Sequence, residues 1–308
     1  MIEYRNVGMV YGQNEILTQI DLTIKDGEFF VLVGPSGSGK TTLLRMLNRL
    51  TVPTRGDIYL DGIKIKDHDI QKLRLSMGYV LQESSLFPNL TLEDNIALQL
   101  EQLGVSKAKR RKRAQELLEL VELPASKYAK RYPKDISGGQ KQRVALVRAL
   151  AADPKLILMD ESFSALDPVL RQQMQTLILK LWQKFKMTVV FVTHDMQEAL
   201  RLGQRIAVLN EGQLKQVGTP HEILTAPADR FVKEFFSQGP KKTLTLKELI
   251  ASLSLAPKPY DEKCPELTAV VEVLSYLRKQ PSLDFNYHEA TYTLTLDQLL
   301  QYLESAGI

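Results

Sequence analysis

The chain has 308 residues, 44% of them apolar and 25% charged, with a net charge of +4, and this ordinary globular composition excludes collagen-like and intrinsically disordered classes. A single cysteine, Cys264, excludes an intrachain disulfide and a cysteine-ligated metal cluster, and it favours a reducing compartment. No apolar run reaches the length of about 18 residues that spans a bilayer, and the first residues lack a signal-peptide core, so the sequence predicts a soluble chain.

The first 60 residues have the pattern of antiparallel strands. Residues 4–7 and 19–24 alternate polar and apolar side chains. Turn residues follow at Gly12, Gln13 and Asn14, and again at residues 25–27. This part of the chain is therefore expected to form antiparallel β structure.

Short apolar runs and helical patterns alternate further along the chain. The apolar runs indicate strands buried on both faces, at residues 29–33, 58–60, 156–159, 189–193 and 206–209. The helical patterns lie at residues 41–50, 113–121, 139–152, 169–185 and 196–202. This alternation predicts an α/β domain with a largely parallel sheet.

Three parts of the chain are expected to be structurally distinct. The stretch from about 88 to 152 lacks strong strand signals and predicts a helical subdomain inserted into the α/β core. A composition shift near residues 238–242 predicts a boundary between a domain at 1–238 and a small α+β domain at 241–308, with the order helix, Pro-rich loop, helix, strand, helix. The first 240 residues carry a net charge of +6 and the rest −2, which suits a ligand with phosphates but is too weak to indicate nucleic acid.

A glycine-rich phosphate motif follows the first buried run. It reads Gly34, Pro35, Ser36, Gly37, Ser38, Gly39, Lys40, Thr41, which is G-x-x-x-x-G-K-T between a predicted strand and a predicted helix. Glycines let backbone N–H groups converge on phosphate oxygens, and the helix N-terminus adds its positive dipole end. Lys40 is expected to reach the β and γ phosphates, and the Thr41 hydroxyl to ligate Mg²⁺.

Two carboxylates end the apolar run at residues 156–159. Asp160 and Glu161 stand at the carboxyl end of a predicted strand, where open α/β sheets bind their ligands. Asp160 is expected to hold Mg²⁺ together with Thr41. Glu161 is expected to act as the general base that orients or deprotonates the attacking water.

A third motif is the segment Ser137, Gly138, Gly139, Gln140 after Ile136. Ser137 is a good helix N-cap and the glycines expose N–H groups, so this is a second predicted anion site. The segment resembles the L-S-G-G-Q signature of ATP-binding cassette (ABC) ATPases, with Ile in place of Leu. The resemblance covers residues 1–238 and implies that ATP is sandwiched between the glycine loop of one subunit and this signature in a second subunit.

The resemblance implies roles for further residues. Tyr11 corresponds to the aromatic that stacks on adenine, and Thr42 belongs to the ATP-binding loop. Gln82 corresponds to the glutamine that senses Mg²⁺, His194 to the histidine that contacts the γ-phosphate, and Asp167 to the loop that crosses the dimer interface. Ser162 departs from the family pattern, which has proline there, and this could loosen the geometry of Glu161.

A closer resemblance concerns cargo. Segments similar to the ATPases of osmoprotectant importers lie at residues 46–50, 53–54, 86–88, 131–133 and 194–199. This resemblance implies a homodimeric, ATP- and Mg²⁺-dependent ATPase on the cytoplasmic face of the membrane. Its partners would be two permease subunits and a substrate-binding protein, and its cargo glycine betaine, carnitine, choline or proline. Paired regulatory CBS modules often follow such cassettes, but the tail has about half their length and shows no clear CBS pattern.

Several alternatives stay open. The importer could carry a polyamine, an amino acid or another quaternary amine. A non-transport ABC ATPase of DNA repair or translation is disfavoured, because long coiled coils and a second cassette are missing, and a kinase or GTPase is disfavoured by the signature.

The basic run at residues 107–113 is interpreted as a solvated helix face rather than a lipid or nucleic-acid contact. The role of residues 241–308 is not decided by the sequence.

Overall fold

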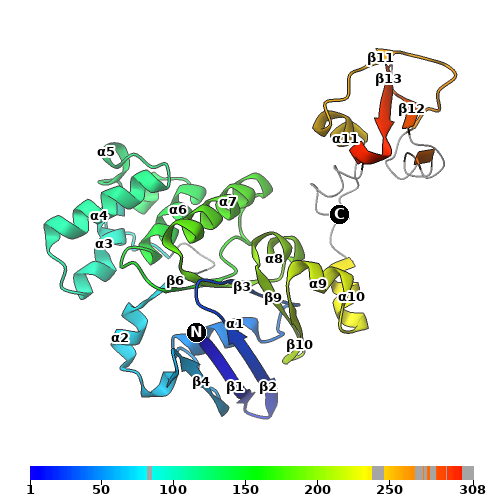
Figure 1. The fold of residues 1–308 in the computed structure, drawn as a ribbon. Coiled ribbons are helices and arrows are strands. Elements are labelled where there is room, and N and C mark those ends of the chain that lie inside the picture. Colours follow the sequence, from blue (N-terminus) through cyan, green and yellow to red (C-terminus); the bar gives the residue numbers. More distant parts are fainter. Residues whose placement is uncertain are drawn as a thin grey trace. The chain divides into compact units, whose positions relative to one another are not determined.

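The computed structural model describes residues 1–81, 85–237, 246–267, 273, 276–277, 282–288 and 290–299. Two compact units make up the chain, Met1–Gly239 and Pro240–Ile308, and each is described by itself. Figure 1 shows the elements of both.

A largely parallel sheet forms the centre of the first unit. Within the described residues it has six strands in the order β10-β9-β3-β8-β7-β6. All neighbours pair in parallel except β9 and β10, which are antiparallel. The α/β prediction is therefore confirmed, but β6 had no clear sequence signal. The strands are β3 (Phe29–Val33), β6 (Met77–Val80), β7 (Leu156–Asp160), β8 (Thr188–Thr193), β9 (Arg205–Asn210) and β10 (Gln213–Gly218).

A second, antiparallel sheet holds the N-terminal strands. Its order is β2-β1-β4-β5, from β1 (Ile2–Tyr11), β2 (Asn14–Ile24), β4 (Arg55–Leu60) and β5 (Ile63–Lys64). Strands β1 and β2 are joined by the two-residue turn Gly12-Gln13, in which Gly12 has a φ of 60°. The run at residues 58–60 was predicted to be buried on both faces and is not. It lies in β4, beside β1, where only Ile58 is buried.

Two apolar cores lie on the two faces of the central sheet. Along β3, Phe29, Val31 and Val33 belong to one core, and Phe30 and Leu32 to the other, as strand alternation requires. The second core also contains the antiparallel sheet and helix α1 (Lys40–Leu47), whose Leu43 carbonyl accepts a hydrogen bond from the Tyr4 hydroxyl. Helix α1 is thus fixed against both sheets, and this fixes the end of the loop that precedes it.

The remaining helices of the first unit pack mainly on the other core. Helices α3 to α6 come between β6 and β7 in the chain; Figure 1 shows α3, α4 and α5 gathered to one side of the sheet, and α6 packs on β6. The basic run lies within α4, which begins six residues before the helical pattern that the sequence showed. The helices are α2 (Ile70–Leu75), α3 (Leu92–Gln102), α4 (Lys107–Leu120), α5 (Ala125–Tyr128), α6 (Gly138–Ala149), α7 (Pro168–Phe185), α8 (Met196–Leu202), α9 (Pro220–Thr225) and α10 (Arg230–Ser237).

The second unit has a small apolar core of its own, and its described residues form a three-stranded antiparallel sheet. Its described elements are α11 (Leu246–Ser252), β11 (Lys258–Pro259), β12 (Ser282–Tyr287) and β13 (Ala290–Thr295). The sequence predicted one strand here, whereas β12 and β13 form a hairpin. Its turn was missed because His288, with a φ of 55°, takes a conformation that glycine or asparagine usually signals. The second predicted helix falls largely outside the described residues, and the last one does so in part. Within the described ranges, no helix has the length and apolar character that crossing a bilayer requires.

Candidate functional site

The loop from Gly34 to Gly39 connects β3 to α1 and depends on its glycines. Gly37 and Gly39 have φ values of 80° and 96°, in the left-handed region that other residues rarely adopt. A Cβ on Gly34 would lie 2.0 Å from the Leu209 carbonyl oxygen. The glycines therefore allow a tight loop whose backbone lies directly against the neighbouring strand.

Lys40 folds back over this loop. Its Nζ donates to the carbonyl oxygens of Gly34 and Pro35, at 2.9 and 2.7 Å, and lies 3.4 Å from Ser38 Oγ. Burial lowers the pKa of Lys40, and the nearby carboxylates of Glu161 and Asp160 oppose that change. The ammonium is thus held at the loop by backbone dipoles that an anion could replace.

The N-terminus of α1 faces the same loop. Its cap residue is Gly39, which has no side chain to accept from the first N–H groups of the helix, and no acidic residue stands in the first turn. The first four N–H groups of a helix have no partner inside the helix. Lys40, Thr41 and Thr42 therefore present backbone donors suited to an anion.

Asp160, at the end of β7, joins this loop to the sheet edge. The Thr41 hydroxyl donates to Asp160 Oδ1 over 2.8 Å, and Arg45 Nη2 lies 3.4 Å from Asp160 Oδ2. Tyr79 of β6 also lies close: burial raises the pKa of its phenol, and the Asp160 carboxylate raises it further. The sequence motifs did not indicate Arg45 or Tyr79, because neither belongs to a local pattern.

Glu161 follows Asp160 in a strained conformation. Its φ is 45°, and its N–H donates to the Val192 carbonyl over 3.0 Å. The carboxylate Oε2 lies 3.2 Å from Nδ1 of His194, which follows β8. Non-glycine residues held at positive φ concentrate at functional sites. Here the strain turns Glu161 out of the strand toward His194.

The segment after Glu161 is a compact turn. The Ser164 hydroxyl donates to the Glu161 carbonyl over 2.9 Å, and Asp167 caps α7 by accepting from the Leu170 N–H over 3.0 Å. Ser162 is buried, its carbonyl accepts from Gln142, and its hydroxyl finds no partner among the described residues. The turn is therefore fixed at both ends despite the serine in place of proline.

The signature segment begins α6 with a capping box. Gln140 N–H donates to Ser137 Oγ over 3.3 Å, and Ser137 N–H donates to Gln140 Oε1 over 3.0 Å. A Cβ on Gly139 would lie 2.6 Å from Leu170 Cδ2, but a Cβ on the exposed Gly138 would meet nothing within 4 Å. No hydrogen bond or ion pair in the described part of the chain joins residues 137–140 to the loop at 34–42.

Tyr11 and Gln82 are the two remaining residues that the sequence predicted for the site. Tyr11 is 52% exposed at the end of β1, in the hairpin whose Ile16 and Leu17 pack against Gly39. Gln82 lies outside the described residues. The carboxyl edge of the parallel sheet thus brings together five of the predicted residues, Lys40, Thr41, Asp160, Glu161 and His194. Residues 137–140 are not joined to this group.

A glycine loop leading into a helix, with two carboxylates at the end of the adjoining sheet, defines a P-loop nucleotide-binding protein. A family model described as ABC transporter matches residues 17–164. The glycine betaine/carnitine/choline transport ATP-binding protein of Bacillus subtilis is 48% identical over 239 residues, which are 77% of this chain and 63% of that protein. The osmoprotectant import ATP-binding protein of Salmonella typhimurium is 47% identical over 231 residues, 75% of this chain and 59% of that protein.

A solved structure agrees with these similarities. An ATP-binding cassette in a dimeric, post-hydrolysis state with ADP and Pi is 38% identical, with a TM-score of 0.63, and the match covers 71% of this chain and 99% of that one. The chain belongs to the ABC transporter family of ATP-binding subunits. It spans about three-fifths of the length of the two curated relatives.

Proposed function

We propose that the chain is the ATP-hydrolysing subunit of an ABC importer for an osmoprotectant. The observation that carries the proposal is the hydrogen bond of 2.8 Å between the Thr41 hydroxyl and Asp160, with Glu161 and His194 beside it. It joins the glycine loop to the carboxylates of the sheet edge in one site. The relatives from Bacillus subtilis and Salmonella typhimurium, a glycine betaine/carnitine/choline transport protein and an osmoprotectant import protein, support the osmoprotectant class.

Phosphates of ATP would bind at the loop. Backbone N–H groups of residues 36–39 and the N-terminus of α1 would donate to the phosphate oxygens, with Lys40 turning from loop carbonyls to the β and γ phosphates. Thr42 would add its donors in the first turn of α1. The exposed Tyr11 ring would stack on adenine.

The oxygen atoms present suit Mg²⁺. A hydroxyl and a carboxylate oxygen 2.8 Å apart are ligand types that this ion prefers, so Thr41 and Asp160 would hold it, with Gln82 as the third protein ligand. Bound there, Mg²⁺ would neutralise charge on the β and γ phosphates.

Hydrolysis would use Glu161 and His194. Glu161 accepts a proton from water as the water oxygen bonds to the γ-phosphorus and the bond to the bridging oxygen breaks, giving ADP and phosphate. His194, 3.2 Å from Glu161, would orient that carboxylate and contact the γ-phosphate. A general base contributes about 10²–10⁴-fold to such a step.

A second copy of the chain would complete the site. Ser137 and Gly138 are exposed, and among the described residues no atom lies within 4 Å of a Cβ at position 138, so no contact in that part of the chain requires glycine there. A γ-phosphate held by the partner's loop supplies that reason, because a Cβ would obstruct its approach to the N–H groups. The Asp167 loop would cross the same interface. The homodimer would bind two permease subunits at the cytoplasmic face of the membrane, served by a substrate-binding protein. Residues 241–308 would be a separate small domain.

Uptake of labelled glycine betaine and choline at high salt tests this proposal. Cells lacking the gene would be complemented with the wild type, with Glu161→Gln, or with the matched control Glu211→Gln in the exposed turn after β9. We expect the wild type and the control to restore uptake and Glu161→Gln not to. Uptake that is the same without the gene would contradict the osmoprotectant assignment.

A further inference from the structure

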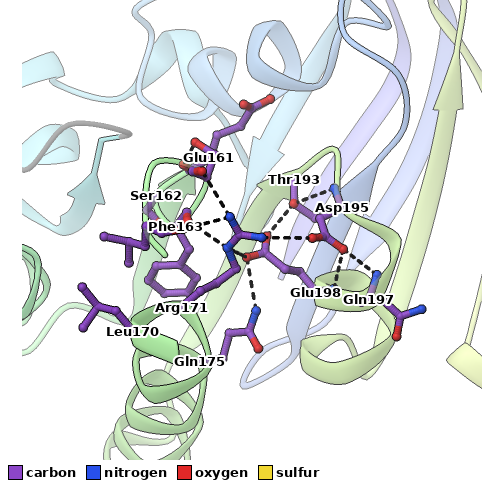
Figure 2. A network of polar contacts seen from close by, with 12 residues as sticks. Glu161, Ser162, Phe163, Leu170, Arg171, Gln175, Thr193, Asp195, Gln197 and Glu198 are labelled. Carbon is purple, nitrogen blue, oxygen red and sulfur yellow. Dashed lines mark hydrogen bonds and ion pairs between the residues drawn. The ribbon is translucent and has the colours of Figure 1, made fainter. Parts of the chain in front are cut away.

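Arg171, in the first turns of α7, binds the backbone of the turn that follows Glu161. Its Nη2 donates to the carbonyl oxygens of Ser164 and Leu166, at 3.3 and 3.0 Å, and its Nε to that of Phe163 at 3.3 Å. Figure 2 shows the guanidinium directed into this turn. One side chain therefore holds three of the carbonyls between Glu161 and Asp167.

The same guanidinium faces the carboxylates that follow β8. Its Nη1 lies 3.5 Å from Asp195 Oδ2, and its Nε lies 4.0 Å from Glu198 Oε1. Both carboxylates lie on the α8 side of the network in Figure 2. Arg171 thus connects the turn after β7 with the turn after β8.

Glu198 extends the network to the residue before His194. It is buried and accepts from Thr193 Oγ1 at 2.6 Å and from Gln175 Nε2 at 3.2 Å. The Asp195 N–H in turn donates to Thr193 Oγ1 over 3.0 Å. His194 therefore lies between two residues, Thr193 and Asp195, that both belong to the Arg171 network.

A planar guanidinium suits this position and an ammonium does not. Arginine has five N–H donors in a fixed fork, so it can serve several carbonyls and a carboxylate at once. Lysine keeps the charge but offers a compact group that cannot reach all of these acceptors together. These contacts therefore require the planar guanidinium group as well as its positive charge.

We infer that Arg171 is a positioning residue, which fixes the turn bearing Glu161 and Asp167 to the turn bearing His194. Its side chain contacts backbone carbonyls of the first turn and the carboxylates of Asp195 and Glu198. The inference rests on the proposed function, because Glu161 and His194 matter only if ATP is hydrolysed there. A conformational change of the loop that contains Asp167 would then be transmitted to Glu161 and His194 of the same subunit through the Arg171 side chain.

The test compares Arg171→Lys with the matched control Arg201→Lys. Arg201 also joins α8 to α7, through its Nη2 and Thr176 Oγ1 at 3.0 Å, but no hydrogen bond or ion pair between described residues joins it to either turn. We expect Arg171→Lys to lower kcat on the order of tenfold to a hundredfold, with the KM for ATP unchanged, because misplacement of a catalytic group acts on the chemical step. Arg201→Lys should match the wild type.

Hydrogen exchange without nucleotide gives a readout that does not depend on hydrolysis. The amides of Ser164 and Leu166, which donate within the turn, should exchange faster in Arg171→Lys and not in Arg201→Lys. A double variant with Glu198→Gln should lose no more kcat than the worse single variant, as expected for one network.

The inference would be overturned by wild-type kcat in Arg171→Lys, by losses of kcat that multiply in the double variant, or by unchanged exchange at Ser164 and Leu166. A lower melting temperature with normal kcat per folded molecule would mean a purely structural role and would also overturn it. If the wild type itself fails to hydrolyse ATP, the proposed function fails, and the exchange result alone still decides whether Arg171 links the two turns.

Discussion

The Glu161 carboxylate and the His194 imidazole lie 3.2 Å apart, although 33 positions separate them in the chain. They directly follow the neighbouring parallel strands β7 and β8, which pair from Leu156 with Thr188 to Asp160 with Val192. The sheet alone brings both side chains to one edge. The hydrogen bond from the Glu161 N–H to the Val192 carbonyl then fixes the Glu161 carboxylate beside the His194 ring.

Glu161→Gln is expected to lower ATP turnover by about 10²–10⁴-fold and to keep ATP affinity. The amide has the same shape but cannot accept the proton from water, while the phosphate loop is unchanged. Phosphate release under saturating ATP and the binding of a fluorescent nucleotide measure the two effects. Rapid steady-state hydrolysis by this variant would remove Glu161 from its role, and Glu211→Gln serves as the control.

Gly138→Ala is expected to leave the folded subunit at least as stable as the wild type while hydrolysis is lost. Position 138 is the first residue of α6, without positive φ and with no atom within 4 Å of the new methyl group. At such a compatible position alanine stabilises by about 0.4–1 kcal/mol, because it lowers the conformational entropy of the unfolded chain. Thermal melting and ATPase assays check the two halves.

Gly139→Ala is the comparison for that variant, because its methyl group would meet Leu170 inside the subunit. We expect it to lower stability as well as activity. Wild-type hydrolysis by Gly138→Ala would contradict a role for position 138 between subunits.

Ser162→Ala is expected to stabilise the protein by about 1 kcal/mol, because it removes a buried hydroxyl that lacks a partner among the described residues. Ser164→Ala is the matched control and should destabilise, since it loses the hydrogen bond of 2.9 Å to the Glu161 carbonyl. Urea unfolding measures both. Destabilisation by Ser162→Ala would show that its hydroxyl is bonded after all.

Glu198→Gln is expected to change how stability depends on pH. Burial, the largest influence, raises the pKa of Glu198 above its ordinary value of 4.5, so between the two values the folded state keeps a proton that the unfolded state has lost. This contribution to stability is full below pH 4.5 and is lost as the pH rises through the folded pKa. The variant lacks it.

The unfolding free energy of Glu198→Gln, relative to the wild type, should therefore grow as the pH rises from about 4 toward neutrality. Urea unfolding of both proteins across that range checks the sign. A difference that stays flat, or shrinks with rising pH, would contradict the buried carboxyl.

Much of the site follows from local patterns. Glycines that need positive φ, a helix that starts at Lys40, and carboxylates at the end of an apolar strand are all visible in the sequence, and parallel strands bring their carboxyl ends to one edge. The α/β class follows from the same runs. These features depend on backbone geometry that a few adjacent residues determine.

Other features depend on contacts between distant residues. Strand β6 has four residues and contains Gly78, which weakens the strand signal; a Cβ there would lie 2.4 Å from the Ala149 carbonyl oxygen. Arg171 carries no motif that distinguishes it from other helical arginines. Its role becomes visible only when the turns after β7 and β8 are seen to share one guanidinium (Figure 2).

Sedimentation of purified Glu161→Gln with and without MgATP tests the central claim most directly, because the sandwich requires ATP to join two copies. We expect a monomer without nucleotide and a dimer with ATP, and Gly138→Ala in the same background should prevent that dimer. A protein that binds ATP and stays monomeric at every concentration would contradict the claim.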